Sequence, residues 1–277
     1  MNFFRDFVAI FPLLWLTIVG IFGCIIGSFL NVVIYRLPLM LERRWRREAL
    51  LQLEQPVPES MHPFNLILPR SCCPHCSHQI RIRDNIPLLS YLYLKGETHC
   101  CGQRIPYHYP LVEMMCAMLF MLAAWKFSLS LLLIGSWIFL SMLLVLAIID
   151  YRTYLLPDIL TLPLLWLGLL FNLPEGYISL EQAVVGAISG YLCLWCLYWA
   201  FRFVTGKEAL GYGDFKLLAA LGAWMGWQAL PQIILLAAGS GLIVTLLVRS
   251  QTQTSISRPL AFGPWLALSA GYYFLIK

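Results

Sequence analysis

The stretch LSMLLVLAIIDYRTYLLPD, residues 140–158, decides the fold class. An apolar run ends at Asp150, and a second apolar run begins at Asp158 after only a few polar residues. This pattern is typical of membrane-spanning helices joined by short loops. The composition agrees, because 60% of the 277 residues are hydrophobic and only 12% are charged, which is about half the charged share of a soluble domain. The sequence therefore predicts an all-α polytopic membrane protein that is embedded in a lipid bilayer.

In both directions from this stretch, the apolar pattern predicts eight transmembrane helices. They cover residues 10–35, 110–126, 129–149, 158–173, 182–203, 213–228, 230–248 and 259–276. The first run lacks the basic start and the small-residue cleavage site of a secretory signal peptide, so we expect it to remain in the protein. We divide the chain into a first transmembrane helix (1–36), a cytoplasmic domain (37–109) and a seven-helix membrane domain (110–277).

The distribution of positive charge predicts the orientation. This topology places 16 of the 19 lysines and arginines on one side of the membrane, and leaves Arg5, Lys126 and Lys277 on the other. Because basic residues concentrate in cytoplasmic loops, we expect the long insert in the cytoplasm and both termini in the periplasm. Within residues 37–60, LERRWRREALLQLEQ has the spacing of an amphipathic helix at the membrane surface, with a simple solvated helix as the alternative.

A small module rich in cysteine and histidine follows, at residues 69–106. Cys73 and Cys76 form a C-x-x-C pair, and Cys100 and Cys101 follow about 24 residues later. Two such thiolate pairs are typical of a structural zinc site, which can fold a module too small for a core of its own. Cys73, Cys76 and Cys101 are the candidate ligands. The fourth ligand is open among Cys100, which we take, His99 and Cys72. Free reduced thiols are the alternative to a metal site.

Asp150 and Asp214 are the candidate catalytic residues. Asp150 lies at a helix C-terminus, where a negative charge opposes the helix dipole, and pairing with Arg152 is the structural alternative. Asp214 lies in GYGDFK, residues 211–216, where it opens a predicted helix and where a plain helix cap is the alternative. Carboxyl groups on two helices can meet inside a bundle, share a proton and hydrolyse a peptide bond. We expect Asp150 to carry the proton and Asp214 to act as the base.

Several stretches together resemble one known family, the type IV prepilin peptidases. The stretches are GSFLNVVIYRLP (27–38), IRIRDNIPLLSYLYLKG (80–96) beside the C-x-x-C pair, YPLVE (109–113), DYRTYLLPD (150–158) and KEALGYGDFKLLAALGAW (207–224). The members of this family are bifunctional leader peptidase/N-methyltransferases of bacterial pilus and type II secretion systems. They are similar to other GxGD intramembrane aspartyl proteases. The resemblance covers nearly the whole chain.

The resemblance implies an activity, a cofactor and partners. The catalytic pair of the family maps onto Asp150 and Asp214. The substrates implied are prepilins or pseudopilins, whose basic leader is cut after a glycine at the cytoplasmic face of the bacterial inner membrane. The new N-terminal residue is then methylated with S-adenosylmethionine, an activity linked to the cytoplasmic module. Asp158, Glu208 and Glu113 are candidates for binding the basic leader, and the sequence does not choose among them. We expect no nucleic-acid partner.

Two departures from the family pattern leave alternatives open. Thr98 stands where the second C-x-x-C pair would begin, and Glu97 follows Gly96 where the family often has a basic residue. Both fall in the part that is linked to metal binding and methylation, so a peptidase without methyltransferase activity is one alternative. A proton-coupled membrane transporter is another, since intramembrane acids also suit ion translocation. The position of the acids at one membrane face, away from the midplane, favours the peptidase.

Overall fold

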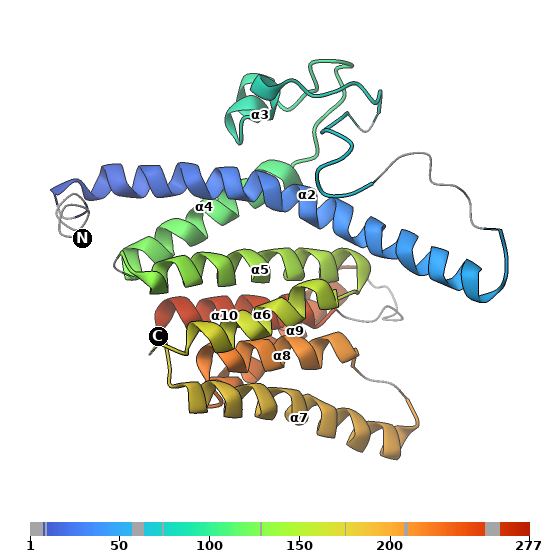
Figure 1. Cartoon of the computed structure of the whole chain (residues 1–277), viewed down its shortest axis with the longest axis vertical. Coiled ribbons are helices and arrows are strands. Elements are labelled where there is room, and N and C mark those ends of the chain that lie inside the picture. Colours follow the sequence, from blue (N-terminus) through green and yellow to red (C-terminus); the bar gives the residue numbers. More distant parts are fainter. Residues whose placement is uncertain are drawn as a thin grey trace. The chain divides into compact units, whose positions relative to one another are not determined.

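The computed structural model describes residues 8, 10–56, 64–73, 75–127, 129–174, 176–207, 210–252 and 261–277. In this part of the chain the regular structure is helical, with two isolated β-bridges beside it (Figure 1). This confirms the predicted all-α class. The chain divides into two compact units, Met1–Leu129 and Ser130–Lys277. Each unit is described by itself.

The first unit is built on two long apolar helices, α2 (Pro12–Gln52) and α4 (His108–Lys126). Between them in the chain lie the short helices η1 (Ile82–Asn85) and α3 (Leu89–Tyr93). Glycines on α2 let the two long helices approach closely, as small residues do in membrane bundles. A Cβ atom on Gly23 would lie 2.6 Å from the Cα of Ala117, so no larger residue fits there without a shift of the backbone.

Helix α2 continues through Pro38 to Gln52. The predicted amphipathic segment is therefore the second half of one helix, and the predicted boundary at residue 36 falls inside it. Proline lacks the N–H that would continue the helical hydrogen bonds, and it usually bends a helix. Figure 1 shows α2 changing direction along its length. Near this point the buried Arg36 donates hydrogen bonds to the carbonyl oxygens of Asn65 (2.9 Å) and Pro69 (2.7 Å), which fixes the following loop on α2.

In its described residues, the second unit is a bundle of six helices. They are α5 (Leu131–Thr153), α6 (Asp158–Phe171), α7 (Leu180–Thr205), α8 (Tyr212–Met225), α9 (Leu230–Thr252) and α10 (Gly263–Ile276). Helix α8 is the most enclosed, since it packs against α6, α7, α9 and α10. Every residue from Asp214 to Met225 is buried except Lys216. The apolar side chains of α8 are therefore buried against the neighbouring helices of the same unit.

Two polar side chains fix the end of α8 that is distant from Asp214. The indole Nε1 of Trp224 donates to the carbonyl oxygen of Leu164 on α6 (2.8 Å). The buried amide of Asn172 donates to the carbonyl oxygen of Ala223 (2.9 Å) and accepts from the backbone N–H of Tyr177 (2.9 Å). Because these groups are buried and paired, α8 has little freedom to shift along its axis.

Each of the eight predicted spans corresponds to a helix in the described part of the chain. Five described helices are long and apolar enough to cross a membrane, namely α2, α4, α5, α7 and the Leu230–Leu247 part of α9. Helices α6, α8 and α10 have 14 residues each, a length of about 21 Å, against a hydrocarbon core of about 30 Å. The membrane character is supported, and the count of eight crossings stays a prediction.

Candidate functional site

Asp150 lies in the last turn of α5 with only 5% of its surface exposed. Its Oδ2 atom accepts a hydrogen bond from the backbone N–H of Gly263, the first residue of α10, at 3.0 Å. The first N–H groups of a helix have no partner within the helix and favour an anion. The start of α10 therefore supplies the N–H donor that the C-terminal end of α5 cannot offer to the carboxyl group of Asp150. Arg152, the alternative partner, forms no ion pair with Asp150 among the described residues.

Gly263 approaches Asp150 so closely that only glycine fits. A Cβ atom at this position would lie 2.6 Å from Oδ2 of Asp150 and 3.2 Å from Cδ1 of Leu156. No pattern in the sequence predicted a role for this residue. The available signal was a glycine directly before Pro264 at the start of the last apolar run, since proline is common in a first helical turn. Nothing in that pattern says which distant side chain the glycine meets.

Asp214 lies in the first turn of α8 and is 7% exposed. Its backbone N–H donates to the carbonyl oxygen of Gly211 (3.2 Å), and its Oδ2 atom lies 3.5 Å from where a Cβ of Gly211 would be. A larger residue at position 211 would therefore stand directly beside the carboxyl group. The helix start was predicted. Of the two glycines, Gly213 is the one where close approach excludes a side chain, since its Cβ would lie 2.7 Å from Cβ of Leu156.

The two candidate acids lie at the same end of the second unit. Leu156, in the loop between α5 and α6, contacts both Gly213 and Gly263, since its side chain lies 2.7 Å and 3.2 Å from where their Cβ atoms would be. The end of α5, the start of α8 and the start of α10 therefore meet around one leucine. Both acids lie at helix ends on one side of the unit, and their pairing as catalytic residues stays a prediction.

Asp158 has a different environment. It opens α6 as predicted, and both its oxygens accept hydrogen bonds from Nζ of Lys216, at 2.7 Å and 2.8 Å. This ion pair joins α6 to α8, and the Asp158 side chain is 56% exposed. Of the three acids considered for leader binding, Asp158 thus already has a cation, Glu113 belongs to the first unit, and Glu208 lies outside the described residues.

The cysteine module of the first unit contains two loops of the same construction, residues 72–79 (without 74) and 97–104. In each loop an antiparallel bridge joins the first and eighth residues. The N–H of the second residue donates to the carbonyl of the seventh, and the N–H of the sixth donates to the carbonyl of the second. The sixth residue has a positive φ, 56° at Ser77 and 66° at Gly102. By this correspondence Thr98 takes the place of Cys73, and Cys101 takes that of Cys76.

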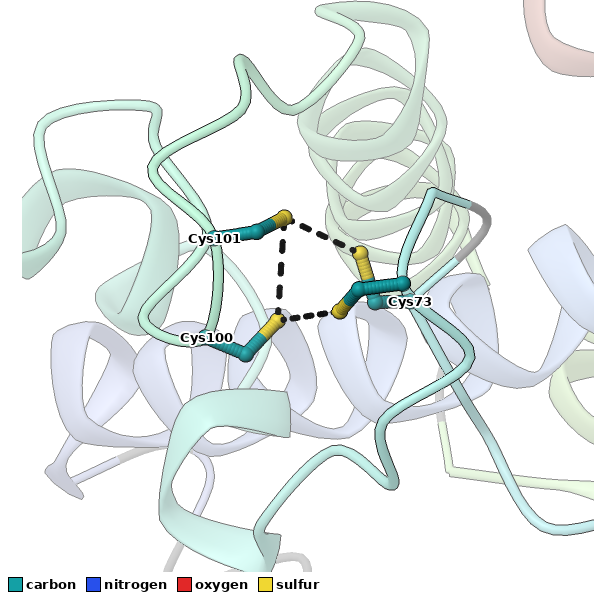
Figure 2. Close-up of side chains that lie close together, drawn as sticks. Cys73, Cys100 and Cys101 are labelled. Atoms are coloured by element: carbon teal, nitrogen blue, oxygen red, sulfur yellow. Dashed lines mark hydrogen bonds between the residues drawn. The ribbon is translucent and has the colours of Figure 1, made fainter.

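The fourth sulfur atom comes from a shifted position, Cys100. The sulfur atoms are 3.6 Å apart for Cys73 and Cys101, 3.3 Å for Cys76 and Cys100, and 3.9 Å for Cys100 and Cys101. Figure 2 shows the side chains of Cys73, Cys100 and Cys101 pointing toward one another. Four sulfur atoms around a tetrahedral zinc ion would be about 3.8 Å apart. All four ligand atoms lie within 4.8 Å of one another, and His99 and Cys72 are not in this group.

Thr98 also contributes to the cluster, although it offers no thiolate. Its hydroxyl oxygen lies 3.2 Å from the sulfur of Cys101 and lowers the pKa of that thiol. In the other loop, the backbone N–H groups of Cys76 and His75 lower the pKa of Cys73 to about 6. The thiolate is the form that binds metal. The sulfur of Cys76 acts in the opposite direction on Cys100 and raises the pKa of that thiol to about 12. The surroundings therefore favour the thiolate at Cys73 and Cys101, while Cys100 completes the set of sulfur atoms that Thr98 interrupts.

Comparison with known proteins places these sites in a family. The bacterial peptidase A24 N-terminal domain matches residues 21–127, and the type IV leader peptidase family matches residues 137–246. A prepilin leader peptidase/N-methyltransferase of Pectobacterium carotovorum is 56% identical over 277 residues, covering 100% of this chain and 99% of that protein. Proteins of the same name from Dickeya chrysanthemi (55% identical, 95% of this chain and 93% of that protein) and Klebsiella pneumoniae (53%, 84% and 95%) are also similar.

No solved structure matches the chain. The two family models lie one on each compact unit, with the cysteine module in the first match and both candidate acids in the second. The agreement extends over almost the full length of the relatives. The chain belongs to the type IV leader peptidase family.

Proposed function

We propose that this protein is an intramembrane aspartic endopeptidase that removes the basic leader of type IV prepilins or pseudopilins after a glycine, and that it then methylates the new N-terminal residue. The observation that carries the proposal is the pair of buried acids, Asp150 and Asp214, at one end of the same helical unit. Ionisable groups at such positions are costly and are functional candidates by default. The names of the relatives describe the same two reactions.

The geometry suggests how the acids divide the work. Oδ2 of Asp150 is bound by the N–H of Gly263, so the proton that the pair shares lies on Oδ1 of Asp150 or on Asp214. One carboxylate takes a proton from the attacking water, and the other donates a proton to the peptide carbonyl oxygen. We expect Asp150 to donate and Asp214 to accept in the first step, with the roles exchanged as the products leave.

We also propose that Cys73, Cys76, Cys100 and Cys101 hold a structural zinc ion. The sulfur distances of 3.3–3.9 Å suit tetrahedral coordination by thiolates. The module has few buried side chains of its own, so a metal would supply cohesion that a core cannot. We further propose a membrane topology in which both termini are periplasmic. The cysteine module and the side that binds the leader then face the cytoplasm.

Both activities can be tested in one assay on protein that is purified in detergent. It is incubated with a prepilin-type substrate and S-adenosylmethionine, and the products are identified by mass spectrometry. The proposal predicts a product without its leader that carries one added methyl group. Cleavage without methylation would support a peptidase that has lost its second activity. No cleavage by folded, zinc-loaded protein would refute the peptidase assignment.

A further inference from the structure

The first unit contains a cavity of about 760 Å³ that the peptidase chemistry does not use. It lies among α2, the start of α4 and the cysteine module, and its lining includes Asn31, Tyr91, Tyr109 and Glu113. Its volume is in the range of pockets that hold small organic ligands. Three tyrosines are in the lining, since Tyr35 joins the two just named, and aromatic side chains of this kind stack against nucleobases.

Glu113 is the chemically conspicuous residue of this cavity. It is 8% exposed and lies on α4. Its Oε2 atom accepts a hydrogen bond from the backbone N–H of Leu88 (2.8 Å), and Ser28 supplies a further hydrogen bond. Among the described residues no cation is paired with it. The nearby buried cation, Arg36, is already held by backbone carbonyls. A buried carboxylate that lacks a cation is costly, and such groups mark binding sites.

The contact between Leu88 and Glu113 requires a strained backbone. Leu88 has φ 57° and ψ −46°, and the N–H of Leu89 donates to the carbonyl of Pro87 at 2.6 Å. This is a γ-turn with positive φ, which is rare for a residue with a side chain. Strain of this kind persists where the surroundings enforce it, and it clusters at functional sites. The turn directs one backbone donor at the carboxylate and so orients it.

We propose that this cavity is the methyl-transfer site, and that Glu113 receives the α-amino group of the cleaved substrate. The inference deepens the proposed function and rests on its second reaction. The donor S-adenosylmethionine has an adenine ring, a sulfonium cation and polar hydroxyl groups. The cavity offers tyrosine faces, the carboxylates of Asp84 and Glu113, and the amide of Asn31. Its lining also contains Arg36, Arg81 and Arg104, which suit the carboxylate of the donor, and cysteines of the cluster form one wall. The volume and these groups fit the donor.

Glu113 has two tasks in this scheme. An α-amino group is largely protonated at neutral pH, so its ammonium form forms a charge-assisted hydrogen bond with the carboxylate. For transfer, the amine must lose a proton. Its nitrogen then forms a bond to the methyl carbon, the carbon–sulfur bond breaks, and the electron pair remains on sulfur. The released proton passes to the Glu113 carboxylate and from there to water.

Binding of the donor tests the location. Gln79 is exposed and lines the cavity, while Gln103 is exposed on the companion loop and does not line it. The Kd of radiolabelled S-adenosylmethionine is measured by equilibrium dialysis with full-length Gln79→Trp and Gln103→Trp. We expect Gln79→Trp to weaken binding at least about tenfold by filling the cavity, and Gln103→Trp to stay within about twofold. Equal, wild-type binding by both variants would overturn the location.

Glu113→Gln tests the residue, because it keeps the acceptor for Leu88 and removes the charge. We expect leader cleavage at the wild-type rate and a Kd for the donor within about threefold of wild type. The kcat of methylation should fall about 100-fold or more, the usual effect of losing a proton acceptor. Glu113→Asp should recover part of the loss. Methylation by Glu113→Gln at the wild-type rate would overturn the role of this residue.

Failure of this inference and failure of the proposed function give different results. If wild-type protein cleaves but neither binds the donor nor methylates, the methyltransferase assignment fails and takes this inference with it. If wild-type protein methylates and the Gln79→Trp and Glu113→Gln variants match it, only the inference fails. Loss of cleavage in Glu113→Gln at an unchanged melting temperature would place Glu113 in leader binding and overturn its role in methyl transfer. If the melting temperature falls as well, Glu113→Asp decides, since a carboxylate that restores cleavage without methylation contradicts the role.

Discussion

The two proposed sites of this protein are positioned in opposite ways. Asp150 and Asp214 lie at the ends of packed helices, are less than a tenth exposed, and are bordered by glycines that admit no Cβ. Three of the four clustered cysteines are exposed and lie in short loops that a few backbone hydrogen bonds shape. Rigid helix ends can hold reacting groups without help. Exposed loops need a bound ion to hold four thiolates together. We therefore expect the acid pair to depend on helix packing and the cysteine cluster to depend on the proposed zinc ion.

The largest effect is expected from removing either acid. Asp150→Asn and Asp214→Asn keep the shape of the side chain, so the helices should pack as before. Leader cleavage should fall at least about a thousandfold in each variant, because each loses a proton donor or acceptor. Glu181→Gln, an exposed acid in the first turn of α7, is the matched control and should cleave normally. Normal cleavage by both asparagine variants would contradict the assignment of Asp150 and Asp214 as catalytic residues.

The cysteine cluster should respond to its ligand in a way that the acid pair does not. Cys100→Ser should weaken zinc binding at least about a hundredfold, since even the loss of an outer-shell partner costs 10- to 100-fold. Adding Thr98→Cys to this variant should restore one zinc per chain, because Thr98 occupies the ligand position of the companion loop. Zinc is measured by metal analysis of the purified full-length protein.

Recovery of zinc binding on adding Thr98→Cys would show that Cys100 replaces a ligand at position 98. Lack of recovery would show that the second loop no longer forms a ligand site. Peptidase activity should remain within about threefold in both variants, because the acids belong to the other compact unit. Full zinc content in Cys100→Ser alone would contradict the assignment of the fourth ligand. It would return His99 or Cys72 as candidates, although neither belongs to the group of sulfur atoms in the structure.

Gly263→Ala tests whether the acid site tolerates a single methyl group. The new Cβ would lie 2.6 Å from Oδ2 of Asp150, so the carboxyl group or the start of α10 must shift. A displacement of about 1 Å in a reacting group can cost about 100-fold in rate. We expect kcat of cleavage to fall 10- to 100-fold, with KM and melting temperature little changed. Gly271→Ala, on the same helix, is the control, since the nearest atom to its Cβ would be 3.8 Å away.

The sequence predicted the helices better than the contacts between them. Apolar runs and a proline or glycine at their ends are local signals, so spans such as 158–173 and 230–248 match α6 and α9 closely. The pairing of Asp150 with Gly263 joins residues 113 positions apart, and no local pattern records it. The continuity of α2 through Pro38 went against a local signal, because proline usually ends or bends a helix.

The cysteine module shows the same limit from the other side. The irregular second pair suggested a damaged site, since Thr98 interrupts the expected motif. The backbone hydrogen bonds show instead that both loops have the same construction. The fourth sulfur atom of the cluster belongs to Cys100, two positions after Thr98. A motif records which positions hold cysteine, while the backbone decides which of their side chains lie together.

The smallest effect is expected from breaking the ion pair between Lys216 and Asp158, an exposed acid at the start of α6. Its side chains are 31% and 56% exposed, and surface pairs contribute about 0–1 kcal/mol to the free energy of unfolding. Lys216→Met should therefore lower the melting temperature by a few degrees at most and leave kcat of cleavage within about threefold. A loss of 100-fold in kcat, with the fold intact, would mean that this pair positions α8 and hence Asp214. Helix packing alone would then not explain the position of the buried acid, because the exposed ion pair between Lys216 and Asp158 would also be needed to hold Asp214 in place.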